Sequence, residues 1–411
     1  MLSSRGWRPT RRRGVMLAAV AMAGLLSVTA GCTKSGNAAW SDGAKPGSSQ
    51  SAEPDTKAKA AITEPAADAS DVPASTAIAF DTTDAVETAV ELKSSDGESV
   101  KGTLSADKKS WLPTGALEWG ASYTATVTAT GDDGKAATAE STFKVMAKPG
   151  NTVAVSSFLG DGAVVGVGMP MIVKFGKAIP QDYRDDVQRR MKVTATPAQE
   201  GTWAWISPTE IHFRPKEFWQ ANTKVHYKLQ TGGLPLGNGS FLRNDLTVDL
   251  KIGPALVMTV NNSTKRMTVT KDGKVIKTIK VSLGKKSTPS STGTMIVIEK
   301  KRKTVFDTFE ELGPEEGYRT DIDFAQRLTW GGEFIHAAPW SEGQQGTTNV
   351  SHGCVNVSMK DGEWLFGQTR IGDPITVKGT ERKLQNGNGW TDWNMTFAEY
   401  AELSAIPLSD Q

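Results

Sequence analysis

One segment near the C-terminal end of the chain combines residues that can do covalent chemistry. It runs from Ile335 to Ser358, reads IHAAPWSEGQQGTTNVSHGCVNVS, and contains two of the chain's four histidines and one of its two cysteines. A thiol becomes a competent nucleophile as a thiolate, and a nearby imidazole can accept its proton. Acyl transfer also needs hydrogen-bond donors directed at the developing oxyanion, which backbone amides at a tight turn provide. We therefore predict that Cys354 is ionised by a neighbouring histidine and acts as the nucleophile of an acyl-transfer site.

Two imidazoles compete for the role of the base. His352 lies two residues before Cys354, so in an extended segment both side chains would point to the same face, whereas in a tight turn they would not. His336 lies at the end of a predicted strand, and strand pairing could bring it beside the cysteine. Gly353 permits an unusual backbone conformation in which successive N–H groups converge on one point. These considerations favour His336 over His352 as the base.

Other roles for the same residues have to be weighed. A buried cysteine is most often an inert small hydrophobic residue. The adjacent glycine, the export signal described below and the absence of a bridging partner favour a reactive thiol instead. One cysteine and two histidines without a supporting carboxylate pattern make a poor zinc ligand set. We therefore expect no metal and no other cofactor.

The N-terminus carries the pattern of an export signal. The run RRRGVMLAAVAMAGLLSVTAGC has an arginine cluster and an apolar stretch, and it ends in two small residues before Cys32. It resembles a bacterial lipoprotein signal, which predicts a signal peptide over residues 1–31, lipidation of Cys32, and an exported protein held at the cell membrane facing the cell wall. Thr29 departs from the usual pattern, where an aliphatic residue is expected. An ordinary secretory signal or an uncleaved anchor is the alternative.

Composition limits the class of partner and the fold. The 411 residues include 47 basic and 45 acidic side chains, so the net charge of +2 gives no field that would favour nucleic acid. Twelve tryptophans against 5 tyrosines, together with abundant glycine and threonine, favour β strands joined by tight turns.

The first part of the chain reads as a tether and two β domains. Residues 32–59 are rich in Ser, Ala, Gly, Pro and charge, which predicts a flexible tether. Residues 60–147 and 148–252 show alternating strands broken by turns, which predicts two immunoglobulin-like β-sandwich domains. His212 and His226 lie within alternating strands, so we expect both at surface or half-buried positions.

The remaining sequence predicts a third domain and a tail. Residues 253–379 form a further β unit in which Ser358 caps a short helix. Within this unit the strand pattern dissolves over 300–329, which is typical of a functional loop or lid. The tail, residues 380–411, is rich in tryptophan and is expected to pack back on the third domain. The fold class is therefore mainly β, with two sandwiches, a β-rich catalytic domain with a short helix, and a Trp-rich C-terminal subdomain.

The segment around Cys354 resembles the active-site signature of the L,D-transpeptidases, which have a YkuD-type catalytic domain. Their shared pattern is a histidine, a loop, and then Ser-His-Gly-Cys. The resemblance extends to the stretches STPSSTGTMIV, GYRTDIDFA, GDPITV and DWN. The order of lipoprotein signal, two immunoglobulin-like domains, catalytic domain and Trp-rich subdomain is similar to that of the mycobacterial, actinobacterial type of enzyme.

The resemblance implies roles for individual residues. Cys354 would be the acylated nucleophile, His336 its base, and the backbone carbonyl of Ala337 the group that holds the imidazole. Serine or glycine is usual at the position of Ala337, but alanine has the same backbone carbonyl and can hold the imidazole in the same way. The oxyanion hole would be formed by the backbone N–H groups of His352, Gly353 and Cys354. Substrate contacts are implied for Tyr318, Trp340, Ser351, His352 and Asn356, and residues 300–330 match the active-site lid.

The resemblance also implies the reaction. The enzyme would form 3→3 cross-links in peptidoglycan by acyl transfer from a tetrapeptide stem, with release of D-Ala, to the diaminopimelate side-chain amine of a second stem. Its partners would be peptidoglycan stem peptides and, through the N-terminal lipid, the membrane. Carbapenems would acylate the same cysteine.

Three alternatives remain at this stage. A papain-like cell-wall cysteine peptidase would place its cysteine before its histidine, which is the reverse of the order here. A sortase has the order His, Cys, Arg, and Arg370 does follow Cys354, but sortases separate His from Cys more widely. A non-catalytic wall-binding lipoprotein would have an unreactive thiol.

Overall fold

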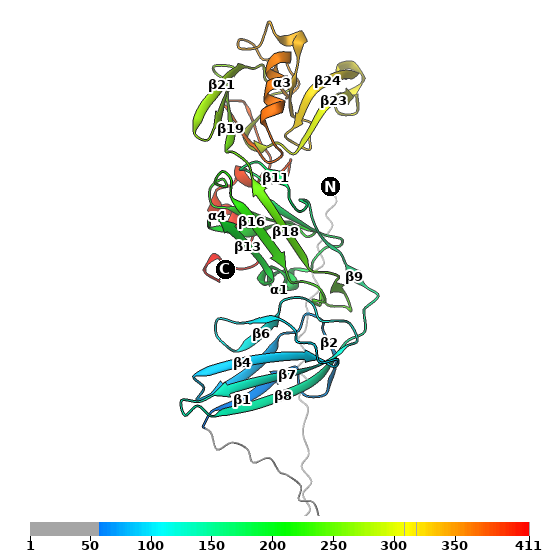
Figure 1. Ribbon diagram of the computed structural model, residues 1–411. Coiled ribbons are helices and arrows are strands. Elements are labelled where there is room, and N and C mark those ends of the chain that lie inside the picture. Colours follow the sequence, from blue (N-terminus) through cyan, green and yellow to red (C-terminus); the bar gives the residue numbers. More distant parts are fainter. Residues whose placement is uncertain (1–56, 308, 318, 411) are drawn as a thin grey trace, which may run out of the picture. The chain divides into compact units, whose positions relative to one another are not determined.

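The computed structural model describes residues 57–307, 309–317 and 319–410, and in these ranges the chain forms seven β-sheets and four short α-helices (Figure 1). The expected signal peptide, the lipidation site Cys32, most of the tether, and Tyr318 lie outside these ranges. In the described part of the chain, no helix is long and apolar enough to cross a membrane.

The first domain is a sandwich of two four-stranded sheets, in the orders β1-β3-β6-β5 and β2-β8-β7-β4. The sequence SYTATVTAT of β7 alternates half-exposed Ser and Thr with buried Tyr, Ala and Val, which is the period of a strand with one face in a core. The strands are β1 Lys59–Glu64, β2 Ala69–Val72, β3 Ile78–Thr83, β4 Glu87–Ser94, β5 Gly102–Leu104, β6 Ser110–Pro113, β7 Ser122–Thr130 and β8 Ala136–Val145.

The second domain has the same architecture, with sheets in the orders β10-β12-β15-β14 and β11-β18-β16-β13 and a small pair β17-β9. The mainly β fold with immunoglobulin-like sandwiches is thereby confirmed. Its strands are β9 Thr152–Val153, β10 Val155–Ser157, β11 Val164–Val165, β12 Met171–Phe175, β13 Met191–Thr196, β14 Gly201–Ser207, β15 Glu210–Pro215, β16 Lys224–Leu229, β17 Phe241–Leu242 and β18 Leu246–Ile252, and its one helix is α1, Arg184–Arg189.

The third domain contains a six-stranded sheet, β21-β20-β19-β27-β22-β28, and a four-stranded sheet, β23-β24-β25-β26. Apolar residues of the first sheet pack with Ile335, Val355 and Leu365, which come from β25, β26 and α3, in one buried core. The elements are β19 Leu256–Asn261, β20 Arg266–Lys271, β21 Lys274–Lys280, β22 Ser291–Ile296, β23 Glu299–Asp307, α2 Phe309–Glu316, β24 Arg319–Arg327, β25 Phe334–Ala337, β26 Val355–Val357, α3 Met359–Gln368, β27 Pro374–Lys378 and β28 Arg382–Lys383.

The segment 300–329 is not irregular, contrary to expectation. Strands β23 and β24 pair antiparallel from Glu299↔Arg327 to Asp307↔Arg319, and α2 forms the tip of this hairpin. Every residue of β23 is exposed or half-exposed, so charged residues are tolerated on both of its faces. The strand therefore lacks the apolar alternation by which sequence analysis finds strands.

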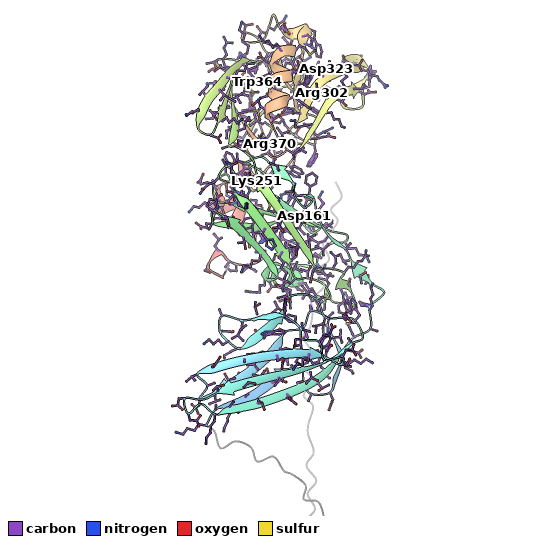
Figure 2. All side chains as sticks on the ribbon, in the orientation of Figure 1. Asp161, Lys251, Arg302, Asp323, Trp364 and Arg370 are labelled. Carbon is purple, nitrogen blue, oxygen red and sulfur yellow. The ribbon has the colours of Figure 1, made fainter. Side chains whose placement is uncertain are left out.

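Helix α3 supports the strand that carries His336. As predicted, Ser358 caps it, and its hydroxyl oxygen accepts a hydrogen bond from the Asp361 N–H at 3.1 Å. A Cβ on Gly362 would lie only 3.0 Å from the Ala337 Cβ, so a glycine lets the helix approach β25 closely. On another face of the helix, Lys277 Nζ lies 4.4 Å from the ring centroid of Trp364 (Figure 2).

The C-terminal tail packs on the third domain, as was expected, where β28 pairs with β22 and Leu384 is buried in the core, and it also packs on the second domain. Trp390 is buried in the core of the second domain, and Trp393 Nε1–H donates to the Gly168 carbonyl at 2.6 Å. Helix α4, Phe397–Ala401, contacts β14. Tryptophan content predicts that a tail is buried, but it does not identify the surface that buries it.

His212 is fully buried, although it was expected at a surface or half-buried position. Its Nδ1 lies 2.8 Å from Asp392 in the tail, and its Nε2 lies 2.7 Å from Glu210. Burial by itself lowers the pKa of His212, but the charges and hydrogen bonds of the two carboxylates outweigh it and raise the pKa to about 9. The expectation failed because Asp392 lies 180 residues further along the chain. His226 is half-buried, as predicted, and lies 2.9 Å from Asp249.

We expect His212→Ala to lower the stability of the second domain by about 3 kcal/mol, because the substitution removes the charged partner of the buried Asp392 carboxylate. Since the folded pKa lies above the unfolded value, this contribution is complete below about pH 6.5 and disappears as the pH rises through about 9. Denaturant unfolding followed by tryptophan fluorescence at pH 6 and pH 10 measures both effects. His226→Ala removes an exposed pair and serves as the control. An equal loss in both variants, or no dependence on pH, would contradict the prediction.

Candidate active site

Two parallel strands bring the predicted base and nucleophile together. Strands β25 and β26 pair in the register Ile335↔Val355 and His336↔Asn356. Since alternate residues of a strand share a face, Cys354 lies on the same face as Asn356, one step back along the sheet. His336 in β25 and Cys354, the residue directly before β26, are therefore brought close together.

The ring of His336 is held in one orientation. Its Nδ1 lies 2.9 Å from the carbonyl oxygen of Ala337, the group that the family resemblance implied. A carbonyl only accepts hydrogen bonds, so Nδ1 carries the proton and Nε2 of the neutral ring keeps its lone pair. The ring is buried, with the edge of Phe306 at a centroid distance of 5.3 Å and Trp340 at 6.0 Å. The geometry gives His336 one available basic nitrogen.

A first cavity of about 340 Å³ contains most of the predicted site residues. The cavity is lined by Thr320, His336, Trp340, Val350, Ser351, His352, Cys354 and Asn356. Thr320 and Val350 were not predicted, although Thr320 lies within the GYRTDIDFA stretch and Val350 directly precedes Ser351. Such a volume suits a small part of a peptide substrate.

A second cavity, of about 300 Å³, meets the first at His352 and Cys354. Its walls come largely from the β23–β24 hairpin and from the loop that precedes β25, including Trp330. Sequence reasoning did not foresee it, because its lining residues are of mixed types and are spread over three separate segments of the chain. The sulfur is thus reachable from two sides.

The structure differs from the expected ionised sulfur. Burial raises the pKa of Cys354 to about 12, with the nearby Glu333 charge adding to the effect and a hydrogen bond from Phe334 opposing it. Burial lowers the pKa of His336 to about 4, against the opposing hydrogen bond to Ala337. The resting pair is therefore a neutral thiol and a neutral imidazole. The thiol points to the carbonyl of Gly332, at an Sγ–O distance of 3.7 Å.

The turn before the cysteine is held by Ser351. Gly353 has a φ of 131°, which L side chains rarely adopt, and its N–H donates to the Ser351 hydroxyl at 3.1 Å. That hydroxyl donates in turn to the carbonyl of Cys354 at 2.7 Å. The Gly353 amide thus already has a partner within the turn, which the prediction of a three-amide oxyanion hole did not foresee. The hole remains a prediction.

Asn356 presents an unpaired acceptor. Its Nδ2 donates to the Ser341 hydroxyl at 3.2 Å, while its buried Oδ1 has no hydrogen-bond partner among the described residues. Leaving a buried acceptor unpaired costs about 1–3 kcal/mol, which a substrate N–H group would recover.

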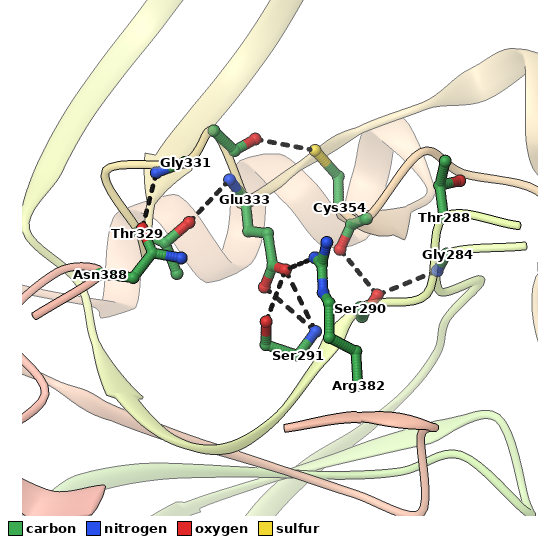
Figure 3. A network of polar contacts seen from close by, with 12 residues as sticks. Gly284, Thr288, Ser290, Ser291, Thr329, Gly331, Glu333, Cys354, Arg382 and Asn388 are labelled. Atoms are coloured by element: carbon green, nitrogen blue, oxygen red, sulfur yellow. Dashed lines mark hydrogen bonds and ion pairs between the residues drawn. The ribbon is translucent and has the colours of Figure 1, made fainter. Parts of the chain in front are cut away.

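A polar network behind the cysteine was missed by sequence reasoning (Figure 3). The buried carboxylate of Glu333 accepts hydrogen bonds from Ser291 and forms an ion pair with Arg382. Ser290 donates to the carbonyl of Gly353 at 2.6 Å. The only signal in the sequence was an acidic residue directly before a buried strand, EFIHA. Among the described residues, no group of three or more His, Cys, Asp or Glu side chains could hold a metal ion.

Comparison with protein families agrees with this arrangement. Residues 256–377 match the L,D-transpeptidase catalytic domain, a range that runs from β19 to β27 and contains His336 and Cys354. Residues 69–235 match the bacterial Ig domain, a range that includes strands of both sandwiches.

Individual relatives extend the match over most of the chain. The chain is 35% identical to L,D-transpeptidase 2 of Mycobacterium tuberculosis (strain CDC 1551 / Oshkosh), over 77% of this chain and 78% of the relative. It is 32% identical to L,D-transpeptidase 5 of M. tuberculosis (strain ATCC 25618 / H37Rv), over 84% of this chain and 76% of the relative. A solved L,D-transpeptidase in complex with imipenem is 32% identical and covers 56% of this chain and 100% of its own, with a TM-score of 0.48. With the catalytic-domain match and two relatives covered over three quarters of their length, the chain belongs to the L,D-transpeptidases, a family of transpeptidase enzymes.

Proposed function

We propose that this transpeptidase forms 3→3 cross-links between peptidoglycan stem peptides, with Cys354 as nucleophile and His336 as base. The observation that carries the proposal is that the Cys354 thiol and an imidazole with one available nitrogen line the same cavity. Family membership supports the reaction class, and the donor and acceptor are assigned by the chemistry below.

The first half of the reaction is acylation. Sγ of Cys354 attacks the carbonyl that joins diaminopimelate to the terminal D-Ala of a tetrapeptide, while its proton moves to Nε2 of His336. Backbone amides of the turn stabilise the oxyanion. Collapse of the intermediate breaks the C–N bond, His336 returns the proton to the leaving amine, and D-Ala departs. A thioester remains on the sulfur.

The second half is transfer to an amine. The side-chain amine of a second stem's diaminopimelate attacks the thioester, loses a proton to His336, and forms a new amide as the C–S bond breaks. The thiolate recovers this proton. The two cavities that meet at Cys354 offer room for donor and acceptor at the same sulfur. The β23–β24 hairpin, which lines the second cavity, would shield the thioester from water.

The neutral resting pair fits a cysteine outside the cytoplasm. A protonated thiol is far less prone to oxidation than a thiolate, since susceptibility follows thiolate character. Proton transfer then coincides with attack on a bound carbonyl, so the reactive form arises only when a substrate is present.

Substrate binding is assigned by extension from the family. Trp340, Ser351, His352 and Asn356 line the first cavity, and the unpaired Oδ1 of Asn356 would accept an N–H of the stem peptide. Tyr318 is assigned to the same role by resemblance alone, since it lies outside the described residues.

The same thiol would react with carbapenems. The strained carbonyl of a β-lactam is an acyl donor that resembles the scissile amide, so a sulfur that forms a thioester with a stem peptide would form one with the drug. The relative that was solved in complex with imipenem supports this proposal by its family membership.

The N-terminal pattern leads to a proposal about location. We infer that the chain is exported and anchored in the cell membrane through a lipid on Cys32, facing the cell wall. The pattern of basic cluster, apolar run and small residues before Cys32 supports this inference.

With a purified tetrapeptide donor, we expect release of D-Ala and formation of a cross-linked dimer. Cys354→Ala should abolish both products, and His336→Ala should slow them by about 10²–10⁴-fold. A carbapenem added first should block the reaction and increase the mass of the wild-type chain, but not that of Cys354→Ala. Mass spectrometry and D-Ala detection measure these outcomes. Turnover by Cys354→Ala, or wild-type protein that makes neither product, would refute the proposal.

The acid limit of the reaction should be unusually low. His336 accepts a proton only while neutral, so kcat/KM for acylation should hold down to about pH 4 before it falls. Phe306→Ser should hydrate the ring and move this limit toward 6.5, the ordinary pKa of histidine. The pH profiles of the two proteins provide the test. A wild-type profile that already falls at pH 6.5 would contradict the assigned environment of His336.

Anchoring can be tested by fractionation. The expressed chain should sediment with membranes and carry the mass of a lipid on Cys32, whereas Cys32→Ser should be secreted or remain as an uncleaved precursor. A wild type that keeps its signal peptide and carries no lipid would indicate an uncleaved anchor, and a soluble, lipid-free wild type would indicate an ordinary secretory signal.

A further inference from the structure

We propose that Glu333 and Arg382 are positioning residues for the nucleophile, an opposed charge pair that holds the loops on both sides of Cys354 and sets the reactivity of its thiol. The inference rests on the proposed function, because it takes Cys354 as the nucleophile. It assigns part of the site to the segment after residue 380.

Glu333 is the last residue of the loop 328–333, whose Gly332 carbonyl faces the thiol of Cys354. Its N–H donates to the Thr329 hydroxyl at 3.0 Å, and its carbonyl accepts the Leu328 N–H at 2.8 Å. The preceding residue, Gly332, provides the carbonyl to which the thiol of Cys354 points. The position of this carbonyl therefore depends on how Glu333 is held.

The carboxylate of Glu333 is held by three donors. It is buried, and it accepts the Ser291 N–H at 3.1 Å, the Ser291 hydroxyl at 2.9 Å, and a charged hydrogen bond from Arg382. Buried carboxylates need such partners, and charge-assisted hydrogen bonds are the stronger ones. Figure 3 shows these contacts converging on the one side chain.

The adjacent serine holds the other loop. The Ser290 hydroxyl donates to the carbonyl of Gly353 at 2.6 Å and accepts the Gly284 N–H at 2.9 Å. Two consecutive serines at the start of β22 thus fix the turn before Cys354 and the loop that faces its sulfur.

Arg382 brings the C-terminal segment into this network. It lies in β28, in register with Ser291 of β22, so strand pairing places it beside the carboxylate. The segment makes a second contact with the same loop, since Asn388 Oδ1 accepts the Gly331 N–H at 2.8 Å.

The charge pair borders the nucleophile turn directly. A Cβ on Gly353 would lie 3.6 Å from Arg382 Nη2 and 3.6 Å from Glu333 Cγ. The two charges should act on the thiolate with opposite signs. The carboxylate disfavours the thiolate and raises the pKa of Cys354, whereas a positive guanidinium beside the same turn favours the thiolate by elementary electrostatics. The pairing with Arg382 should therefore limit how far the carboxylate of Glu333 lowers the thiolate fraction of Cys354.

The test is the rate of iodoacetamide alkylation of Cys354 at pH 9, without substrate. Far below the thiol pKa the rate follows the thiolate fraction, with partial compensation because a thiolate of lower pKa is a weaker nucleophile. For a shift of about one pKa unit we expect Glu333→Gln to react roughly three- to tenfold faster and Arg382→Gln slower by a similar factor. The double variant should return to within about twofold of the wild type.

The controls separate charge from structure. Arg382→Lys should largely restore the wild-type rate, and Lys383→Gln, which removes a neighbouring charge in β28, should leave it unchanged. Cys354→Ala gives the background from Cys32. If both single variants slow alkylation, the pair is only structural, and if neither changes it, the pair does not act on the thiol; either result overturns the inference.

Failure of this inference is distinguishable from failure of the proposed function. Alkylation reports the thiol alone, whereas cross-linking by the wild type reports the reaction. Wild-type turnover with unchanged alkylation rates in the variants would reject the charge pair and leave the proposed function intact. If the two variants shift the alkylation rate in opposite directions but the wild type makes no dimer, the charge pair is supported and the proposed function is rejected.

Discussion

The parallel pairing of β25 with β26 is the constraint on which the site depends. Parallel neighbours cannot be joined by a tight turn, so the chain needs a connection of a dozen or more residues between them. Residues 338–354 are that connection, and they supply Trp340, Ser351 and His352 to the first cavity before ending in Cys354. This one pairing thus brings His336 close to Cys354, and the connection that it requires supplies residues that line the cavity around them.

Burial of that pair determines its chemistry. Burial lowers the pKa of His336 and raises that of Cys354, and the charge of Glu333 raises the pKa of Cys354 as well, so both groups favour their neutral forms. An exposed thiolate–imidazolium pair would be more reactive at rest but would be more easily oxidised. In the buried arrangement the thiol would lose its proton only as it attacks a bound carbonyl, whose oxygen then takes up the negative charge.

The sequence was informative where a feature depends on residues close together in the chain. The Ser358 cap, the alternation in β7 and the spacing of His336 from Ser351-His352-Gly353-Cys354 are of this kind. Features set by distant partners could not be predicted. His212 is buried by Asp392, 180 residues away, and Glu333 is paired with Arg382, 49 residues away. A non-catalytic lipoprotein, one of the initial alternatives, is contradicted by the match to transpeptidase enzymes.

The tail after residue 380 contacts two distant parts of the chain, the loop that faces the sulfur of Cys354 and the second sandwich. Arg382 and Asn388 hold the loop that faces the sulfur, while Asp392 and Trp393 hold the second sandwich. Trp390 lies between these groups in the sequence, and its ring contacts Trp330 at 6.1 Å and Phe158 at 4.6 Å. The same short segment of the tail thus contacts both the second sandwich, through Asp392, and the loop whose carbonyl faces the thiol of Cys354, through Asn388.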